Sequence, residues 1–132
     1  MIGTPGMFEE VERFFQRYAI VAEAMDVDGL SSFHHAPFLH VHGDGRIECL
    51  PTRDAVREFF KALAGKYAGR DHSGGRFLDL EVTPLGSAAA LASLTLEQFR
   101  ADGSVYRRVR RSYNLVRSGS DWNILVATAH GE

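Results

Sequence analysis

The chain has 132 residues, of which 45% are hydrophobic and 24% charged, a composition typical of one globular domain. Its formal net charge of −2 provides no general attraction to nucleic acid or to an anionic membrane surface. The one cysteine, Cys49, excludes an intramolecular disulfide and a cysteine-rich zinc site. We therefore expect a single domain over residues 1–132, with no nucleic-acid partner.

The sequence shows no pattern typical of a signal peptide or of a membrane-spanning segment. The first residues do not combine a basic segment with an apolar core, as a signal peptide would. No apolar run approaches the ~20 residues of a membrane span. The sequence thus predicts a cytoplasmic protein without a membrane partner.

Two helices are expected first. Apolar residues recur at steps of three and four over residues 7–25, which predicts an amphipathic helix. Asp26 is a suitable N-cap for a short second helix, which we expect Pro37 to end because the residue before a proline avoids the helical region. His34 and His35 would then lie at the end of that helix.

A strand is expected over residues 38–42, followed by a glycine-rich turn and an extended run over residues 47–50. Thr52 is a suitable N-cap for a third helix. The glycines and polar residues from 65 to 75 indicate a loop, in which His72 would be exposed.

The second half of the chain alternates apolar and polar residues, which is typical of strands. Turn signals separate four such segments, and the strongest is the pair Asp102-Gly103. The expected strands cover residues 76–83, 88–99, 105–116 and 122–130. Helices followed by an antiparallel meander predict an α+β fold, with three helices packed on a mostly antiparallel sheet.

Three stretches resemble the nuclear transport factor 2-like (cystatin-like) superfamily, which includes ketosteroid isomerases, scytalone dehydratase and polyketide cyclases. They are "FFQRYAIVAEAMDVDGLSSF", "TRDAVREFF" and "YNLVRSGSDWNILVATAH", and their order spans nearly the whole chain. The resemblance implies a cone-shaped roll: a strongly curved sheet wraps around the helices and leaves a pocket at its open end. It also implies a homodimer formed through the outer face of the sheet.

The same resemblance identifies candidate site residues. Ketosteroid isomerases use a tyrosine on the first helix and two acids on strands. Tyr18 matches the tyrosine, while the two acid positions fall near His40 to His42 and near Ser112, where this chain has no carboxylate. Steroid isomerase chemistry is therefore not expected, although Tyr18 retains a hydrogen-bond donor for a ligand carbonyl.

His40 and His42 share one face of the expected strand. Three interpretations remain open for the pair: a metal site, a role in the pocket, or a solvated position at its rim. A metal site needs a third ligand, and no residue stands at a recognisable ligand spacing, so we predict no metal. A histidine that faces the pocket would serve as a proton donor or acceptor near neutral pH. We favour a catalytic role for Tyr18, His40 and His42.

In the arginine-rich run "YRRVRRSYN", the resemblance to the isomerases implies that Ser112 faces inward, together with Arg110 and Asn114. An inward Arg110 would pair with Glu97 or Asp79, or would hold an anionic ligand. Alternatively, the arginines of this run form a ladder of cross-strand ion pairs at the face of the sheet or at a dimer interface. His130, at the end of the last strand, is placed near the pocket mouth. These four residues are the predicted ligand-binding set.

Two classes of function follow. In the first, the protein is an enzyme of the isomerase, dehydratase (lyase) or cyclase type that needs no cofactor and acts on a small hydrophobic or anionic molecule. In the second, the protein binds such a ligand without catalysis, or acts as a dimeric interaction domain. The sequence leaves open whether the protein is an enzyme.

Overall fold

The computed structural model describes residues 6–131. Two helices, α1 (Met7–Glu23) and α2 (Val27–Ser32), open the chain. The strands β1 (His34–Val41) and β2 (Ile47–Leu50) precede the third helix, α3 (Arg53–Ala68). The remaining strands are β3 (Gly74–Pro84), β4 (Ala89–Phe99), β5 (Val105–Ser118) and β6 (Asp121–Ala129). No helix in this range is long and apolar enough to cross a membrane.

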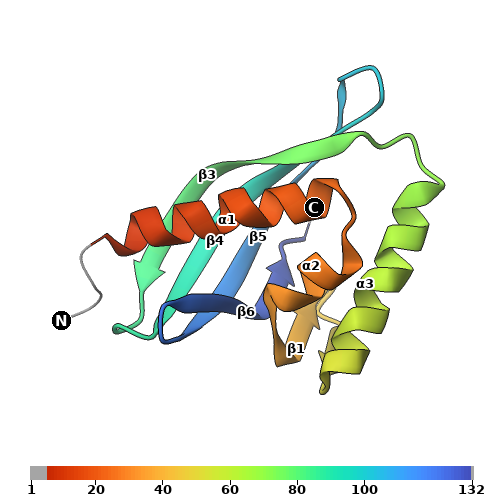
Figure 1. The fold of residues 1–132 in the computed structure, drawn as a ribbon. Helices are drawn as coiled ribbons and strands as arrows, with labels where there is room; N and C mark the ends of the chain where they lie inside the picture. The colour runs from red at the N-terminus through yellow and green to blue at the C-terminus, as the bar shows by residue number, and fades with distance from the viewer. Residues whose placement is uncertain (1–5, 132) are drawn as a thin grey trace.

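The six strands form one curved sheet in the order β2-β1-β6-β5-β4-β3. Every neighbouring pair is antiparallel except β1 and β6, which run parallel. All three helices lie against one face of the sheet (Figure 1), which we call the inner face; the opposite one is the outer face. The predicted α+β class, with three helices on a mostly antiparallel sheet, is confirmed.

Side-chain caps set the starts of two helices, as predicted. The Asp26 carboxylate accepts a hydrogen bond from the Gly29 N–H at the start of α2, and the Thr52 hydroxyl accepts one from the Ala55 N–H at the start of α3. Each such cap satisfies one of the N–H groups that a helix leaves without a partner.

Two predicted boundaries are wrong. The helix α2 ends at Ser32, and Pro37 lies inside β1 rather than at the helix end. Because β1 begins at His34, both His34 and His35 belong to the strand. The segment predicted as a loop over residues 65–75 is also shorter: α3 continues to Ala68 and β3 begins at Gly74. Gly65 is tolerated in the exposed part of the helix.

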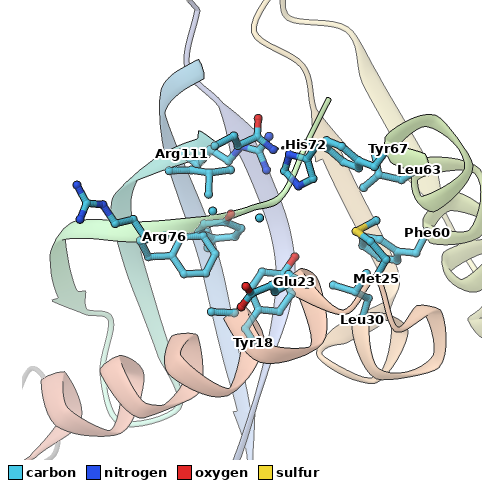
Figure 2. A pocket seen from close by; sticks show the side chains of 18 residues that line it. Tyr18, Glu23, Met25, Leu30, Phe60, Leu63, Tyr67, His72, Arg76 and Arg111 are labelled. Carbon is cyan, nitrogen blue, oxygen red and sulfur yellow. Dashed lines mark hydrogen bonds between the residues drawn. The ribbon is translucent and has the colours of Figure 1, made fainter. Parts of the chain in front are cut away.

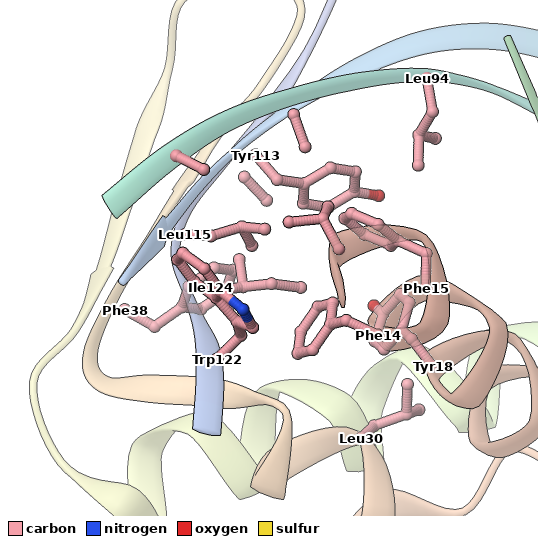
Figure 3. Packing of buried hydrophobic residues seen from close by; sticks show 14 of the residues in the cluster. Phe14, Phe15, Tyr18, Leu30, Phe38, Leu94, Tyr113, Leu115, Trp122 and Ile124 are labelled. Carbon is pink, nitrogen blue, oxygen red and sulfur yellow. The ribbon is translucent and has the colours of Figure 1, made fainter. Parts of the chain in front are cut away.

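The hydrophobic core lies between α1 and the inner face of the sheet (Figure 3). Phe14 and Phe15 of α1 are 1% and 3% exposed, and the Phe15 ring lies 5.1 Å from that of Tyr113 on β5. Burial of each such side chain stabilises the fold by about 1.5–3 kcal/mol. Trp122 closes the core at the start of β6, and its Nε1–H donates to Glu10 Oε2 at 3.2 Å. This packing fills one end of the cone and leaves the other end hollow.

Candidate functional site

The hollow end of the cone holds two adjoining chambers. The larger, of about 300 Å³, lies between α3 and the strands β1, β5 and β6, and we name it the His40 chamber. The smaller, of about 90 Å³, lies between α1, α3, β3 and β4, and we name it the Gln98 chamber (Figure 2). Six residues line both chambers and therefore mark the junction: Tyr18, Phe60, Leu63, Tyr67, Arg111 and Tyr113.

Strand alternation brings both histidines of β1 to the His40 chamber. Phe38, His40 and His42 line it, whereas Leu39 and Val41 point to the outer face. The two imidazole rings meet edge to face, with their centroids 4.6 Å apart. The choice between the two histidines that the sequence leaves open thus has a simple answer: both border the cavity.

His40 is the more enclosed of the two. Its ring lies against Phe59, with centroids 5.3 Å apart, and forms no hydrogen bond with any residue between 6 and 131. Burial, followed by the neighbouring His42 and Arg111, lowers the pKa of His40 to about 4. The side chain is therefore neutral at pH 7 and presents an unused ring nitrogen to the cavity.

His42 is held by its partners on the β1–β2 hairpin. Its Nε2 lies 2.6 Å from Glu48 Oε1, and Arg46 approaches its Nδ1 at 3.3 Å. The arrangement suits a tautomer in which Nε2–H donates to the carboxylate and Nδ1 accepts from the guanidinium. Since both nitrogens are engaged, His42 supports the position of His40 rather than facing a ligand with a free atom.

Tyr18 lies at the junction of the chambers, near the end of the buried stripe of α1. Its ring stacks on Phe77 and meets the His34 ring at a centroid distance of 5.6 Å. The hydroxyl forms no hydrogen bond with any residue in the described range, and burial raises the pKa of Tyr18 well above its ordinary value. The phenol therefore stays protonated and is available as a donor to a ligand.

The inward-facing arginine of β5 is Arg111, and the predicted inward orientation of Arg110, Ser112 and Asn114 is wrong. Arg111 lines both chambers and Tyr113 beside it is 2% exposed. Alternation then places the three predicted residues on the outer face. There, Arg110 forms an ion pair with Glu81 and donates to the carbonyl of Asp79 at 2.9 Å.

The outer face also holds His130, which was expected at the pocket mouth. Its Nε2 lies 2.8 Å from the Ser112 hydroxyl, and this hydroxyl is 2.8 Å from that of Ser93 on the neighbouring strand. His130 follows the end of β6 on the side of the sheet opposite to His40, so the expected position is wrong. The three side chains form a polar row away from the cavity.

Two other histidines border the chambers. His34 is 2% exposed, lines the His40 chamber, and donates from Nδ1 to the Leu30 carbonyl at 2.7 Å. His72, which was expected to be exposed, is half-buried at the edge of the Gln98 chamber. Its Nδ1 lies 2.8 Å from the Tyr106 hydroxyl, and its ring lies against Tyr67.

Sequence reasoning missed Arg111 and Gln98 as residues of the cavity, and it considered Glu48 only as a possible metal ligand. Gln98 is 5% exposed and its Nε2 donates to the Tyr67 hydroxyl at 2.9 Å, while its Oε1 is buried without a partner. One signal would have found the arginine: Val109, Tyr113 and Leu115 form the apolar face of this strand, and Arg111 lies in their register.

No group of three or more His, Cys, Asp or Glu side chains between residues 6 and 131 is arranged to hold a metal ion. His40, His42 and Glu48 come near each other, but Glu48 binds the histidine itself at hydrogen-bond distance. The polar groups that line the cavity include the neutral imidazole of His40, the phenol of Tyr18 and the guanidinium of Arg111.

Comparisons with known proteins agree on the fold. A protein of unknown function with a cystatin-like fold from Nostoc punctiforme has a TM-score of 0.80 at 11% identity, over 100% of this chain and 96% of its own. Aln2 from Streptomyces has a TM-score of 0.72 at 17% sequence identity, over 99% of this chain and 94% of its own. An NTF2-like protein with a cystatin-like fold from Novosphingobium aromaticivorans has a TM-score of 0.73 at 16% sequence identity, over 92% of this chain and 79% of its own.

A search of curated proteins finds no match to the chain. Residues 9–132 match the family model described as "NTF2-like protein (DUF6841)". Because this match covers nearly the whole chain, the protein belongs to the NTF2-like family, the nuclear transport factor 2-like group that its fold also indicates.

Proposed function

We propose that the protein binds a small hydrophobic or anionic molecule in the cone cavity and catalyses a cofactor-independent isomerase, lyase or cyclase type of reaction. One observation carries this proposal: the Tyr18 hydroxyl and the His40 ring border the same void, and neither is engaged in a hydrogen bond with residues 6–131. A void lined by apolar side chains alone would have favoured a passive role.

The chemistry that this pair supports is proton transfer next to a carbonyl group. His40 would take a proton from the carbon beside the carbonyl, and the electron pair of the broken C–H bond would move to the carbonyl oxygen. Tyr18 would donate its hydrogen bond to that oxygen as negative charge develops. The protonated His40 would then return the proton to another carbon, or to a departing hydroxyl group as water.

The basicity of His40 suits this role. A histidine whose pKa is lowered to about 4 is about as basic as an ordinary carboxylate. It also lies where the resemblance to ketosteroid isomerases places the acid that this chain lacks. We assign His42 a positioning role, because Glu48 and Arg46 fix its ring and the ring in turn lies against His40.

The alternative is a non-catalytic binding protein, and hydrogen exchange separates the two. The protein is incubated in D₂O with a panel of small cyclic ketones, and NMR follows both binding and the loss of the protons beside the carbonyl. We expect catalysed exchange that falls by about 10²–10⁴-fold in His40→Gln, and that also falls in Tyr18→Phe. The control His35→Gln, which alters a histidine of β1 outside the cavity lining, should keep the exchange rate of the unaltered protein.

The outcomes of this experiment are distinct. If ketones bind but the exchange of their protons is not catalysed, the protein is a binding protein and the proposed catalytic role is wrong. Exchange that persists unchanged in His40→Gln would contradict the assignment of the base. If no ketone bound at all, the enzyme hypothesis in this form would fail.

We also propose that two copies of the chain associate through the outer face of the sheet. No helix covers this face in Figure 1. Its central part carries half-buried apolar and small hydroxyl side chains on neighbouring strands, including Leu39, Leu91, Ser93, Ser112 and Val126. We expect such a surface to pack against its own copy across a twofold axis, because burial of apolar and small hydroxyl side chains costs little desolvation.

A further inference from the structure

The geometry points to an organic anion as the ligand of the cavity, with its acidic group bound by the guanidinium of Arg111 at the junction of the two chambers. This inference rests on the proposed function, since it requires that the cavity take a small molecule. It adds the chemical class of that molecule and the residue that selects it.

Arg111 is an arginine of the cavity wall whose interaction partners are phenols, chiefly Tyr113 with which it shares a side-chain hydrogen bond, and not carboxylates. Within residues 6–131, no carboxylate lies within ion-pair distance of it, and its Nε is buried without a hydrogen-bond partner. By contrast, five other arginines each pair with a carboxylate: Arg57, Arg76, Arg108, Arg110 and Arg117. A guanidinium is charged at any physiological pH, and enclosing it without an anion is unfavourable.

The surroundings of Arg111 strengthen this reading. Among residues 6–131, those that line the His40 chamber include the cations Lys66, Arg70 and Arg107 besides Arg111, and no aspartate or glutamate. The chain as a whole carries a formal net charge of −2, whereas the charged side chains of this chamber are positive. An entrance of this kind attracts anions and repels cations.

The walls describe the rest of the ligand. Phe38, Phe59, Phe60 and Leu63 line the chamber on the side of β1 and α3, and Ala127 keeps the floor at β6 open. A volume of about 300 Å³ is at the small end of ligand cavities, which suits a molecule of one or two rings. The unpartnered Oε1 of Gln98 offers a second polar contact within the adjoining chamber.

The test compares acids with their uncharged amides. Three matched pairs are titrated by calorimetry: benzoate and benzamide, cyclohexanecarboxylate and its amide, and 2-naphthoate and 2-naphthamide. We expect at least one acid to bind at least tenfold more tightly than its amide. Arg111→Met should abolish this preference. Arg110→Met, which removes the neighbouring arginine from the outer face, should keep it.

A second measurement addresses a purely structural role for Arg111. Methionine has a similar length and carries no charge, so Arg111→Met relieves the cost of an enclosed cation with no anionic partner. We expect the melting temperature of the ligand-free protein to rise in this variant. A fall would mean that Arg111 stabilises the fold, and would overturn the inference.

The remaining outcomes separate this inference from the proposed function. If acids and amides bind equally well, the cavity binds small molecules and the assignment of an anion is wrong. If no member of any pair binds, the assignment of an organic anion fails, and the separate titration with cyclic ketones decides whether the proposed function fails with it. A preference for acids that survives in Arg111→Met would place the anion elsewhere, at the cations of the entrance.

Discussion

Two histidines, His34 and His40, should make the stability of the fold depend on pH, and His34 is the one that lies outside the proposed catalytic pair. It is 2% exposed, and burial lowers its pKa to about 4 even though its hydrogen bond to the Leu30 carbonyl acts in the opposite direction. In the unfolded chain its pKa returns to about 6.5. Between these two values the unfolded chain binds a proton that the folded chain does not, so stability falls as the pH drops from about 6.5 toward 4.

We predict that His34→Asn removes much of this pH dependence. The asparagine amide can replace the Nδ1–H that donates to Leu30, but it does not titrate. One unit of pKa shift corresponds to about 1.4 kcal/mol. Between pH 7 and pH 4.5, the free energy of unfolding should therefore fall by about 2–3 kcal/mol less in the variant than in the unaltered protein. Urea denaturation at a series of pH values measures this difference.

The matched control is His35→Asn, one residue along β1. The His35 ring is less buried and its Nδ1 lies 2.9 Å from the Pro37 carbonyl. This variant should keep the pH profile of the unaltered protein. If both variants changed the profile equally, the effect would not come from the buried imidazole.

For Arg110 and Arg111, the sequence does not determine which of the two adjacent side chains faces the cavity. Adjacent residues of a strand point to opposite faces, so an alignment error of one position exchanges the cavity for the outer face. Ser112 was aligned with a catalytic acid, and this choice set the orientation of the whole run. The apolar residues Val109, Tyr113 and Leu115 specify the opposite orientation, because they must contact the core.

The orientation of β1 was easier to predict. Phe38 is a large apolar residue within β1, and its burial brings His40 and His42 to the same side. The contacts that decide their roles come from elsewhere in the chain: Glu48 approaches from β2 and Arg111 from β5. Such long-range partners are not visible in the local pattern, so the sequence indicated the candidates without separating their roles.

Among the elements, α3 and the β3–β4 pair contain two glycines with opposite requirements. Gly65 lies within α3, and a Cβ added there would meet no atom within 4 Å. Gly75 lies in β3, where a Cβ would come 2.7 Å from the backbone oxygen of Glu97 on β4. From the sequence alone, both glycines are predicted to be parts of one loop, because only the paired strand reveals the close approach.

We predict that Gly65→Ala stabilises the protein by about 0.5–1 kcal/mol, since alanine has the higher helix propensity and the site is open. Gly75→Ala should instead destabilise it by about 1–3 kcal/mol, because the two strands must separate locally to admit the methyl group. Chemical denaturation of both variants provides the measurement. Equal effects of the two substitutions would show that the β3–β4 approach does not constrain this position.

For the whole molecule, the order of helices and strands follows from the sequence, whereas the interior hollow does not. Amphipathic stripes and turn residues are local, so α1, the caps of α2 and α3, and the hairpin at Asp102-Gly103 were all predictable. The cavity instead arises from the curvature of the six-stranded sheet and from the place where the large side chains of α1 and α3 stop filling it. That balance depends on the register of every strand at once.

The two faces of the sheet give the final prediction, which concerns assembly. We expect the unaltered protein to sediment at micromolar concentration with twice the mass of its chain. Val126 lies on the outer face of β6, opposite Leu39 on one neighbouring strand and Asn114 on the other. Val126→Asp would place a charge near the centre of the proposed interface, where its counterpart in the second copy lies close by, and should therefore produce monomers.

Ile20→Asp is the matched control: Ile20 is 69% exposed on α1, on the helical side of the sheet, and its replacement should leave the dimer intact. Circular dichroism confirms that each variant is folded. A monomeric unaltered protein, or a Val126→Asp variant that is folded and still dimeric, would exclude association through this face.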